Sequence, residues 1–198
     1  LARAAELAKA APGSNWLLVI VELCSLTFRA HDKKKANIIA TALFGDGAAA
    51  AILGTHGTGP AIVASGEHIW PASLGVMGWD IENDGFGVLF SRDIPAIVRN
   101  ELMVPLNSFL TQQSKAITDI DTFLFHQASA VVLNKLKKKL NILDSKWFNQ
   151  IENIGNTVSA TIPIAISILQ DEKKFSYSKK YLLMGFGVGL SVAGCILS

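Results

Sequence analysis

Two side chains that could carry chemistry are a histidine at the end of an apolar run and an asparagine in a glycine-containing loop, and each is a weak signal when taken alone. His126 follows the short apolar run 121–125, and Asn156 lies in the glycine-containing loop 155–157. An imidazole N–H and a carboxamide NH2 can each donate a hydrogen bond to an oxygen that gains negative charge, and neither takes up the charge. Each also has a structural interpretation, because asparagine after glycine is common in turns and a histidine at a strand end is more often structural.

Other patterns that would carry chemistry are also weak or absent. No G-x-S-x-G elbow marks a serine nucleophile, and the segment Gly45–Gly47 has neither Walker nor Rossmann spacing. Cys24 and Cys195 lie far apart in apolar surroundings, which argues against a disulfide framework and against a metal site. We therefore expect no metal ligands in this chain.

The composition limits the class of protein that could position these residues. The 198 residues are 50% hydrophobic and 17% charged, with a net charge of +2. This charge is too small to indicate nucleic-acid binding. The lysines at 33–35 and 137–139 are interpreted as solvated faces, with attraction of a phosphorylated or acidic partner as the alternative. The apolar surplus predicts strands covered on both faces, or a surface buried against further chain or a partner.

Helix and strand patterns alternate along the chain and predict an α/β fold. A buried strand is expected over 15–28, and a hairpin is expected around the turn signal Asn83–Gly85. Helices are expected over 1–11, from 38 to the break at 45, and over 94–113, 128–140 and 158–169. The remaining strands are expected after 47, over 61–66 and 121–125, and on both sides of a glycine turn at 185–189.

The uncharged segment 181–198 needs a separate interpretation. Its four glycines and its lack of flanking basic residues favour two short buried strands over a membrane-spanning helix. No signal-peptide pattern opens the chain, so a cytoplasmic location is the simplest expectation.

The combination of strand-end histidine, later asparagine and final G-F-G turn resembles the thiolase superfamily, over essentially the whole chain. The stretches "VELCSLTFR", "ALFGDGAAAAIL", "MGWDIENDGFGVLFSRDIPAIV" and "GFGVGLSV" are similar to chalcone-synthase-like type III polyketide synthases, in particular bacterial alkylresorcinol and alkylpyrone synthases. The stretches "HQA" and "GNT" instead resemble ketoacyl-acyl-carrier-protein synthase III, because most type III polyketide synthases have Pro-Gly-Gly after the histidine.

The resemblance implies a fold and a set of site residues. The fold is a layered αβαβα arrangement of mixed sheets between helices, with 1–66 as the end of the N-terminal half and 67–198 as the C-terminal half. His126 and Asn156 would be catalytic, as donors to the enolate that forms when malonyl-CoA loses CO2. Substrate-binding positions would be Cys24, Thr27, Phe44, Phe86, Val88, Gly185, Phe186 and Gly187, with Phe44 as the gatekeeper.

The resemblance also concerns the nucleophile. Both branches use a cysteine at the N-terminus of a buried helix, and residues 1–10 resemble the remainder of that helix. Neither cysteine of the chain matches the nucleophile position. We therefore expect the nucleophile to precede Leu1, and we expect these residues alone to be inactive.

The implied activity is that of an acyltransferase, a homodimer that condenses an acyl-CoA starter with malonyl-CoA by decarboxylative Claisen condensation. Coenzyme A thioesters would be the substrates, and no metal or redox cofactor is expected. One alternative is a ketoacyl synthase III, which makes a single condensation in fatty-acid synthesis with an acyl-carrier protein. The other alternative is a non-catalytic acyl-binding or scaffold subunit.

Overall fold

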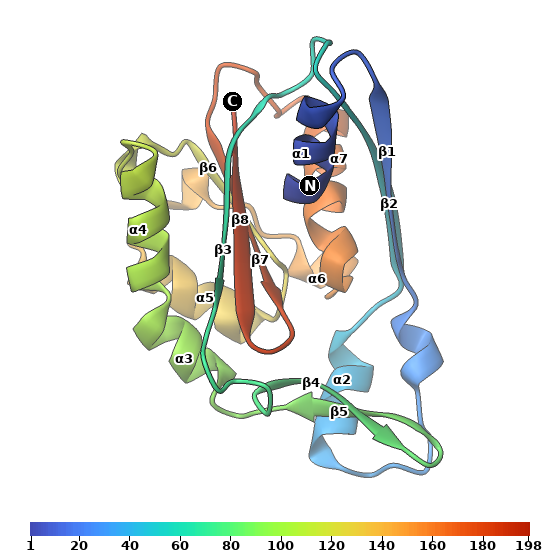
Figure 1. Ribbon diagram of the computed structural model, residues 1–198. Coiled ribbons are helices and arrows are strands. Elements are labelled where there is room, and N and C mark those ends of the chain that lie inside the picture. The colour runs from blue at the N-terminus through green and yellow to red at the C-terminus, as the bar shows by residue number, and fades with distance from the viewer.

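The computed structural model describes residues 1–198 and alternates helices with strands (Figure 1). The helices are α1 (Ala2–Ala10), α2 (Lys35–Leu43), α3 (Ile94–Glu101), α4 (Met103–Gln112), α5 (Ala130–Lys139), α6 (Ile151–Ile154) and α7 (Thr161–Asp171). The strands are β1 (Asn15–Glu22), β2 (Gly47–Gly54), β3 (Ile62–Ile69), β4 (Met77–Glu82), β5 (Gly85–Phe90), β6 (Thr122–Phe125), β7 (Tyr181–Gly187) and β8 (Ser191–Leu197). Short 3-10 helices are η1 (Cys24–Thr27), η2 (Ile117–Asp119), η3 (Asp144–Lys146) and η4 (Val158–Ala160).

The elements form layers (Figure 1). The four-stranded sheet has the order β3-β8-β7-β6, in which β6 runs parallel to β7 and the other neighbours are antiparallel. Helices α3, α4 and α5 cover one face of this sheet, while α1 and α7 lie between it and the separate ladder β1-β2. This arrangement confirms the predicted α/β fold of mixed sheets between helices.

Two apolar clusters hold the four-stranded sheet to its helices. The larger cluster joins Leu102, Leu106 and Leu110 of the helical layer to Phe123 and Leu182 of the strands. The smaller cluster packs α7 on the opposite face, through residues that include Leu124 and Ala165. Because β6 is covered on both faces, its sequence is a continuous apolar run rather than an alternating one.

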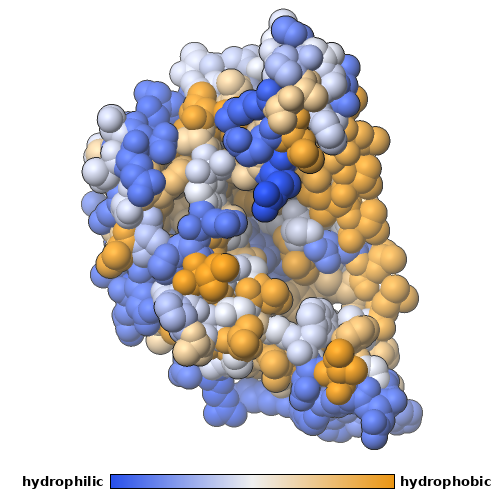
Figure 2. Space-filling view, in the orientation of Figure 1, coloured by the Kyte–Doolittle hydropathy of each residue, from blue (hydrophilic) through white to orange (hydrophobic).

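The strand predicted over 15–28 is wrong in two respects. It ends at Glu22 and continues as η1, and only one of its faces is covered. Leu17, Val19 and Val21 point outward, and Ile52 of the paired strand is also exposed. These side chains contribute to the apolar band along the β1-β2 side of the molecule in Figure 2. The apolar surplus of the sequence therefore gathers partly on this exposed face.

The single helix predicted over 94–113 is divided at Leu102 into α3 and α4. Pro105 explains the division, because it has no N–H to donate to the carbonyl of Glu101 and its ring clashes with a helical carbonyl at that position. The chain bends there while Leu102, Leu106 and Leu110 remain buried. No helix is both long enough and apolar enough to cross a bilayer.

Candidate active site

The parallel strand β6 delivers His126 to the edge of the four-stranded sheet. The His126 N–H donates to the carbonyl of Met184 at 2.8 Å, which extends the β6–β7 ladder by one residue. The Ala128 N–H then donates back to the His126 carbonyl at 2.7 Å, so the chain reverses immediately after the histidine. Ser129 accepts from the Val132 N–H at 3.2 Å and caps α5. The imidazole is therefore fixed between a strand and a capped helix.

The backbone of Asn156 is held by the segment 43–45, which follows α2 and lies more than a hundred residues earlier in the sequence. Its N–H donates to Leu43 at 3.1 Å, and its carbonyl accepts from the Gly45 N–H at 2.9 Å. Phe44 and Asn156 thus form a parallel bridge between the end of α2 and the asparagine loop. Gly155 enters this loop with φ of +65°, a conformation that glycine adopts without steric penalty.

The two side chains meet in a buried environment. His126 Nε2 lies 2.7 Å from Asn156 Oδ1, and the residues are 6% and 3% exposed. Oδ1 also accepts from the Val158 N–H at 3.0 Å, and Nδ2 donates to the Ala128 carbonyl at 3.2 Å. These backbone partners fix which end of the amide faces the ring. Because Oδ1 is an acceptor, a neutral ring carries its proton on Nε2 to make this contact.

The surroundings of His126 favour the neutral ring. Burial lowers the pKa of His126, and this effect outweighs the hydrogen bond to Asn156, the contact with the Phe186 backbone and the charge of Glu22, which all act in the opposite direction. A neutral imidazole with a proton on Nε2 is a hydrogen-bond donor that does not gain charge. The pair can therefore supply donors to an oxygen that becomes negative.

Two contacts with the segment 155–160, called the asparagine loop, and the burial of Gln127 were not predicted from the sequence. The Glu22 carboxylate accepts from the N–H of Ser159 at 3.2 Å and from its hydroxyl. A Cβ on Gly47 would lie 2.8 Å from Cβ of Thr157, so the glycine permits close packing of β2 on the loop. The Gln127 side chain is buried directly beside His126. Glu22 is the only charged residue of the apolar run 15–28, which could have drawn attention to it. The partners of Glu22, Gly47 and Gln127 could not be predicted from sequence spacing.

Among the predicted substrate-binding residues, Phe44 pairs with Asn156, and Cys24 and Thr27 are the first and last residues of η1. Thr27 donates from its hydroxyl to the Cys24 carbonyl at 2.8 Å. Burial, followed by the charges of Glu22 and Asp46, raises the pKa of the Cys24 thiol. Phe44 makes an edge-on contact with Phe90, with ring centroids 6.2 Å apart.

The hairpin β4–β5 carries Phe86 and Val88, and its predicted turn at Asn83–Gly85 is confirmed. Phe86 is 55% exposed and contacts Trp79 edge-on. Arg29 binds Glu82 at 2.8 Å and Asp84 at 2.5 Å, which fastens the hairpin to the segment between η1 and α2.

The glycine turn predicted at 185–189 begins later than expected. Gly185, Phe186 and Gly187 continue β7 in register with β8, and the reversal lies at 188–190. A Cβ on Gly185 would meet no protein atom within 4 Å, whereas one on Gly187 would lie 2.8 Å from Ser191 Oγ. The space beside Gly185 is therefore open, and Gly185 directly follows Met184, whose carbonyl accepts from the His126 N–H.

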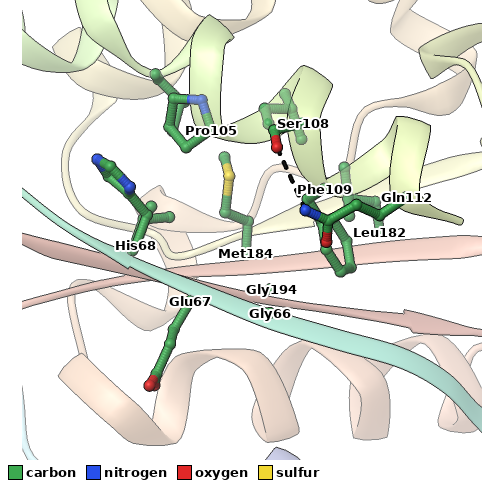
Figure 3. Close-up of a pocket in the computed structure, with 13 residues that line it drawn as sticks. Gly66, Glu67, His68, Pro105, Ser108, Phe109, Gln112, Leu182, Met184 and Gly194 are labelled. Atoms are coloured by element: carbon green, nitrogen blue, oxygen red, sulfur yellow. Dashed lines mark hydrogen bonds between the residues drawn. The ribbon is translucent and has the colours of Figure 1, made fainter.

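A separate cavity of about 150 Å³ lies between α4 and the four-stranded sheet (Figure 3). His68 and Pro105 lie toward one end, Met184 near the middle, and Ser108 and Gln112 toward the other end. Neither His126 nor Asn156 lines it. Met184 belongs to both regions, because its side chain lines the cavity and its carbonyl accepts from His126.

Two family models match different parts of the chain. Residues 1–57 match the N-terminal domain of chalcone and stilbene synthases, and residues 110–198 match the C-terminal part of 3-oxoacyl-[acyl-carrier-protein] synthase III. This division agrees with the mixed resemblance of the sequence, in which the stretches around Cys24 and Phe44 and the loops of His126 and Asn156 point to different branches.

Individual relatives show the same two branches. A putative chalcone synthase of Bacillus subtilis is 36% identical over 96% of this chain and 56% of its own length. A β-ketoacyl-[acyl-carrier-protein] synthase III of Syntrophomonas wolfei is 28% identical over 91% of this chain and 57% of its own length.

A solved structure extends the likeness to three dimensions. The 1,3,6,8-tetrahydroxynaphthalene synthase of Streptomyces coelicolor, a bacterial type III polyketide synthase, is 26% identical and superposes with a TM-score of 0.91 over 99% of this chain and 57% of its own. The chain thus spans little more than half the length of these proteins. Together the site, the fold and the comparisons show that the chain belongs to the thiolase superfamily of condensing enzymes, in the group formed by chalcone-synthase-like type III polyketide synthases and ketoacyl synthase III.

Proposed function

We propose that the protein containing this chain condenses an acyl thioester starter with malonyl-CoA by decarboxylative Claisen condensation, as a type III polyketide synthase. The observation that supports this proposal most directly is the buried His126–Asn156 pair, with 2.7 Å between Nε2 and Oδ1. Both side chains are neutral donors fixed by backbone partners, which suits stabilisation of an enolate.

In the proposed reaction, the bond between the α-carbon and the carboxylate of the malonyl group breaks and CO2 leaves. The electron pair becomes an enolate whose oxygen accepts hydrogen bonds from His126 Nε2 and Asn156 Nδ2. The substrate oxygen competes with Asn156 Oδ1 for the Nε2 proton, and Nδ2 has a second proton besides the one given to Ala128. The α-carbon then attacks the acyl carbonyl, and the thiolate that carried the acyl group is released.

The acyl-carrying thiol is assigned to neither cysteine of this chain. A nucleophilic cysteine needs surroundings that lower the pKa of its thiol. Burial raises the pKa of both Cys24 and Cys195, and two carboxylates raise that of Cys24 further. We therefore expect Cys24→Ala in the intact protein to keep acyl loading and to change the choice of starter length.

The remaining substrate-binding residues are proposed to shape the cavity. Phe44 would separate the entrance from the cavity, with Cys24 and Thr27 along one wall. Phe86 and Val88 would contribute from the hairpin, and the open space beside Gly185 would lie along the growing chain, together with Phe186 and Gly187. No metal or redox cofactor enters this scheme, and we propose a cytoplasmic homodimer by analogy with the family.

We also propose that the division at residue 66 separates two halves of the active site. The first half would supply Leu43, Gly45 and Glu22, which contact the asparagine loop. The second half would supply the two catalytic side chains. β3 starts before residue 66 and pairs with β8, so this strand would join the halves.

Ketoacyl synthase III activity is the second candidate, because residues 110–198 match the model of that family. The two activities differ in their products. When the intact protein is given a fatty acyl-CoA and malonyl-CoA, triketide or tetraketide pyrones and resorcinols would support the first proposal. A single β-ketoacyl product on an acyl-carrier protein would support the second. Neither product, together with tight acyl binding, would indicate a binding subunit.

A further inference from the structure

Gln127 is fully buried, although glutamine is usually exposed in proteins. It lies between His126 and Ala128, two residues that contact Asn156. A buried amide must have hydrogen-bond partners, because an unsatisfied donor or acceptor carries a large desolvation penalty. Its partners therefore indicate what this side chain does at the site.

Both ends of the Gln127 amide bind the backbone of different segments. Nε2 donates to the carbonyl of Phe125, the last residue of β6, at 2.8 Å. Oε1 accepts from the N–H of Gln150, the residue before α6, at 2.9 Å. A carbonyl needs a donor and an N–H needs an acceptor, so these partners determine the amide orientation.

The backbone at Gln127 makes a tight reversal. Ala128 donates to the carbonyl of His126 at 2.7 Å, two residues back, so Gln127 is the central residue of a three-residue turn. The same turn presents the Ala128 carbonyl to Asn156 Nδ2. The side chain of Gln127 thus holds the turn that places one hydrogen-bond partner of Asn156.

The other end of the amide acts on the segment that delivers Asn156. Gln150 is the N-cap of the single helical turn of α6, and its carbonyl accepts from the Ile154 N–H at 3.0 Å. Gly155 and Asn156 follow directly. A displacement of Gln150 would therefore be passed through one short turn to the asparagine.

We propose that Gln127 is a positioning residue that fixes the separation of His126 and Asn156 by joining their two loops through one amide. This inference rests on the proposed role of the pair in condensation. A role in folding alone would predict that loss of the amide lowers stability and leaves turnover by the folded molecules unchanged.

The test uses the intact protein with the substitutions Gln127→Met and Gln127→Glu. Methionine has a similar length and is apolar, so it removes both hydrogen bonds with little change in volume. Because displacements near 1 Å can reduce turnover about 100-fold, kcat for malonyl-CoA decarboxylation should fall by roughly that factor, with KM changed less than about threefold. Leu110→Ala, a buried change in α4 that removes no hydrogen bond of either loop, is the control for lost stability.

Gln127→Glu keeps the inference testable if the methionine variant does not fold. A protonated carboxyl can donate to Phe125 and accept from Gln150, whereas an ionised one cannot donate. Relative to the unsubstituted protein, this variant should regain about tenfold or more of its activity between pH 7.5 and pH 5.5, while circular dichroism shows it folded at both. Activity that stays parallel to that of the unsubstituted protein at both pH values would overturn the inference.

A further readout separates this inference from the proposed function. Absence of condensation by the unsubstituted protein would refute the function, but the ring nitrogens of His126 can still be observed by nitrogen NMR. Gln127→Met should shift the Nε2 resonance, and Leu110→Ala should not. Identical His126 resonances in the Gln127→Met variant and the unsubstituted protein would overturn the positioning role whether or not the protein condenses acyl groups.

Discussion

Substitution of Gly47 in β2 by alanine should disturb the asparagine loop at Thr157, the residue that follows Asn156. The new Cβ would lie 2.8 Å from Cβ and 3.0 Å from Cγ2 of Thr157. Normal contact needs about 3.4 Å or more, so β2 or the loop must move by roughly 0.6 Å. Thr157 cannot rotate away easily, because it is buried and its hydroxyl lies 3.1 Å from that of Thr161.

The size of the effect follows from overpacking. Forcing a methyl group into a packed site typically lowers the free energy of unfolding by about 1–3 kcal/mol. Since Asn156 is the residue next to Thr157, part of the movement should also reach the carboxamide. We expect kcat for malonyl-CoA decarboxylation to fall by about 10- to 100-fold in the intact protein.

The measurement combines urea denaturation with steady-state decarboxylation kinetics. Gly75→Ala is the matched control, because its Cβ would meet no atom within 4 Å and its φ is not in the left-handed region. If Gly47→Ala matches Gly75→Ala in both unfolding free energy and kcat, the close packing of β2 on the loop does not position Asn156. That result would refute the reasoning.

Three further predictions concern charge and hydrogen bonding. Because burial lowers the pKa of His126, activity should persist below the usual histidine pKa of about 6.5 and fall only when the pH passes the lowered value; an acid limb above pH 6.5 in kcat would contradict this. Asn156→Ala should reduce kcat by about 100-fold or more with acyl loading retained, measured by mass spectrometry, and equal loss of both steps would contradict a donor role. The contacts with Lys34 and then Arg29 lower the pKa of Glu82, so the stability gained from these contacts is present above the unfolded pKa and is lost as the pH falls through the folded value. Glu82→Gln should therefore remove part of the stability difference between pH 7 and pH 3 in thermal denaturation, whereas an unchanged difference would exclude the ion pair.

The sequence predicted the elements of the C-terminal part well, because their signals are local. The apolar run before His126, the spacing of apolar residues in α5 and the turn signal at Asn83–Gly85 each correspond to an observed element. The predictions failed where the structure depends on contacts distant in sequence, or on a residue that interrupts an otherwise regular pattern. Pro105 divided a helix whose apolar spacing is otherwise continuous, and the burial of β1 depends on which surfaces contact it.

The candidate site could be predicted only in part for the same reason. The resemblance named His126 and Asn156, and the structure places them in contact. The groups that orient them come from far along the chain, such as Glu22 with Ser159, or from side chains whose partners are backbone groups, such as Gln127. A buried glutamine has no distinctive spacing, so nothing in the sequence separates it from an exposed one.

The bridge between Phe44 and Asn156 restricts how this protein can change its substrates. The proposed gatekeeper and a proposed catalytic donor are adjacent partners in one backbone pairing. A different side chain at position 44 would alter the proposed entrance, while the pairing of Leu43 and Gly45 with Asn156 would be kept. An inserted or deleted residue in the segment 43–45 shifts that pairing and moves the carboxamide. Variation in starter size among such proteins should therefore come from side-chain substitutions, at this position and at wall positions such as Cys24. Insertions and deletions should be confined to the loops on either side of the segment 43–45.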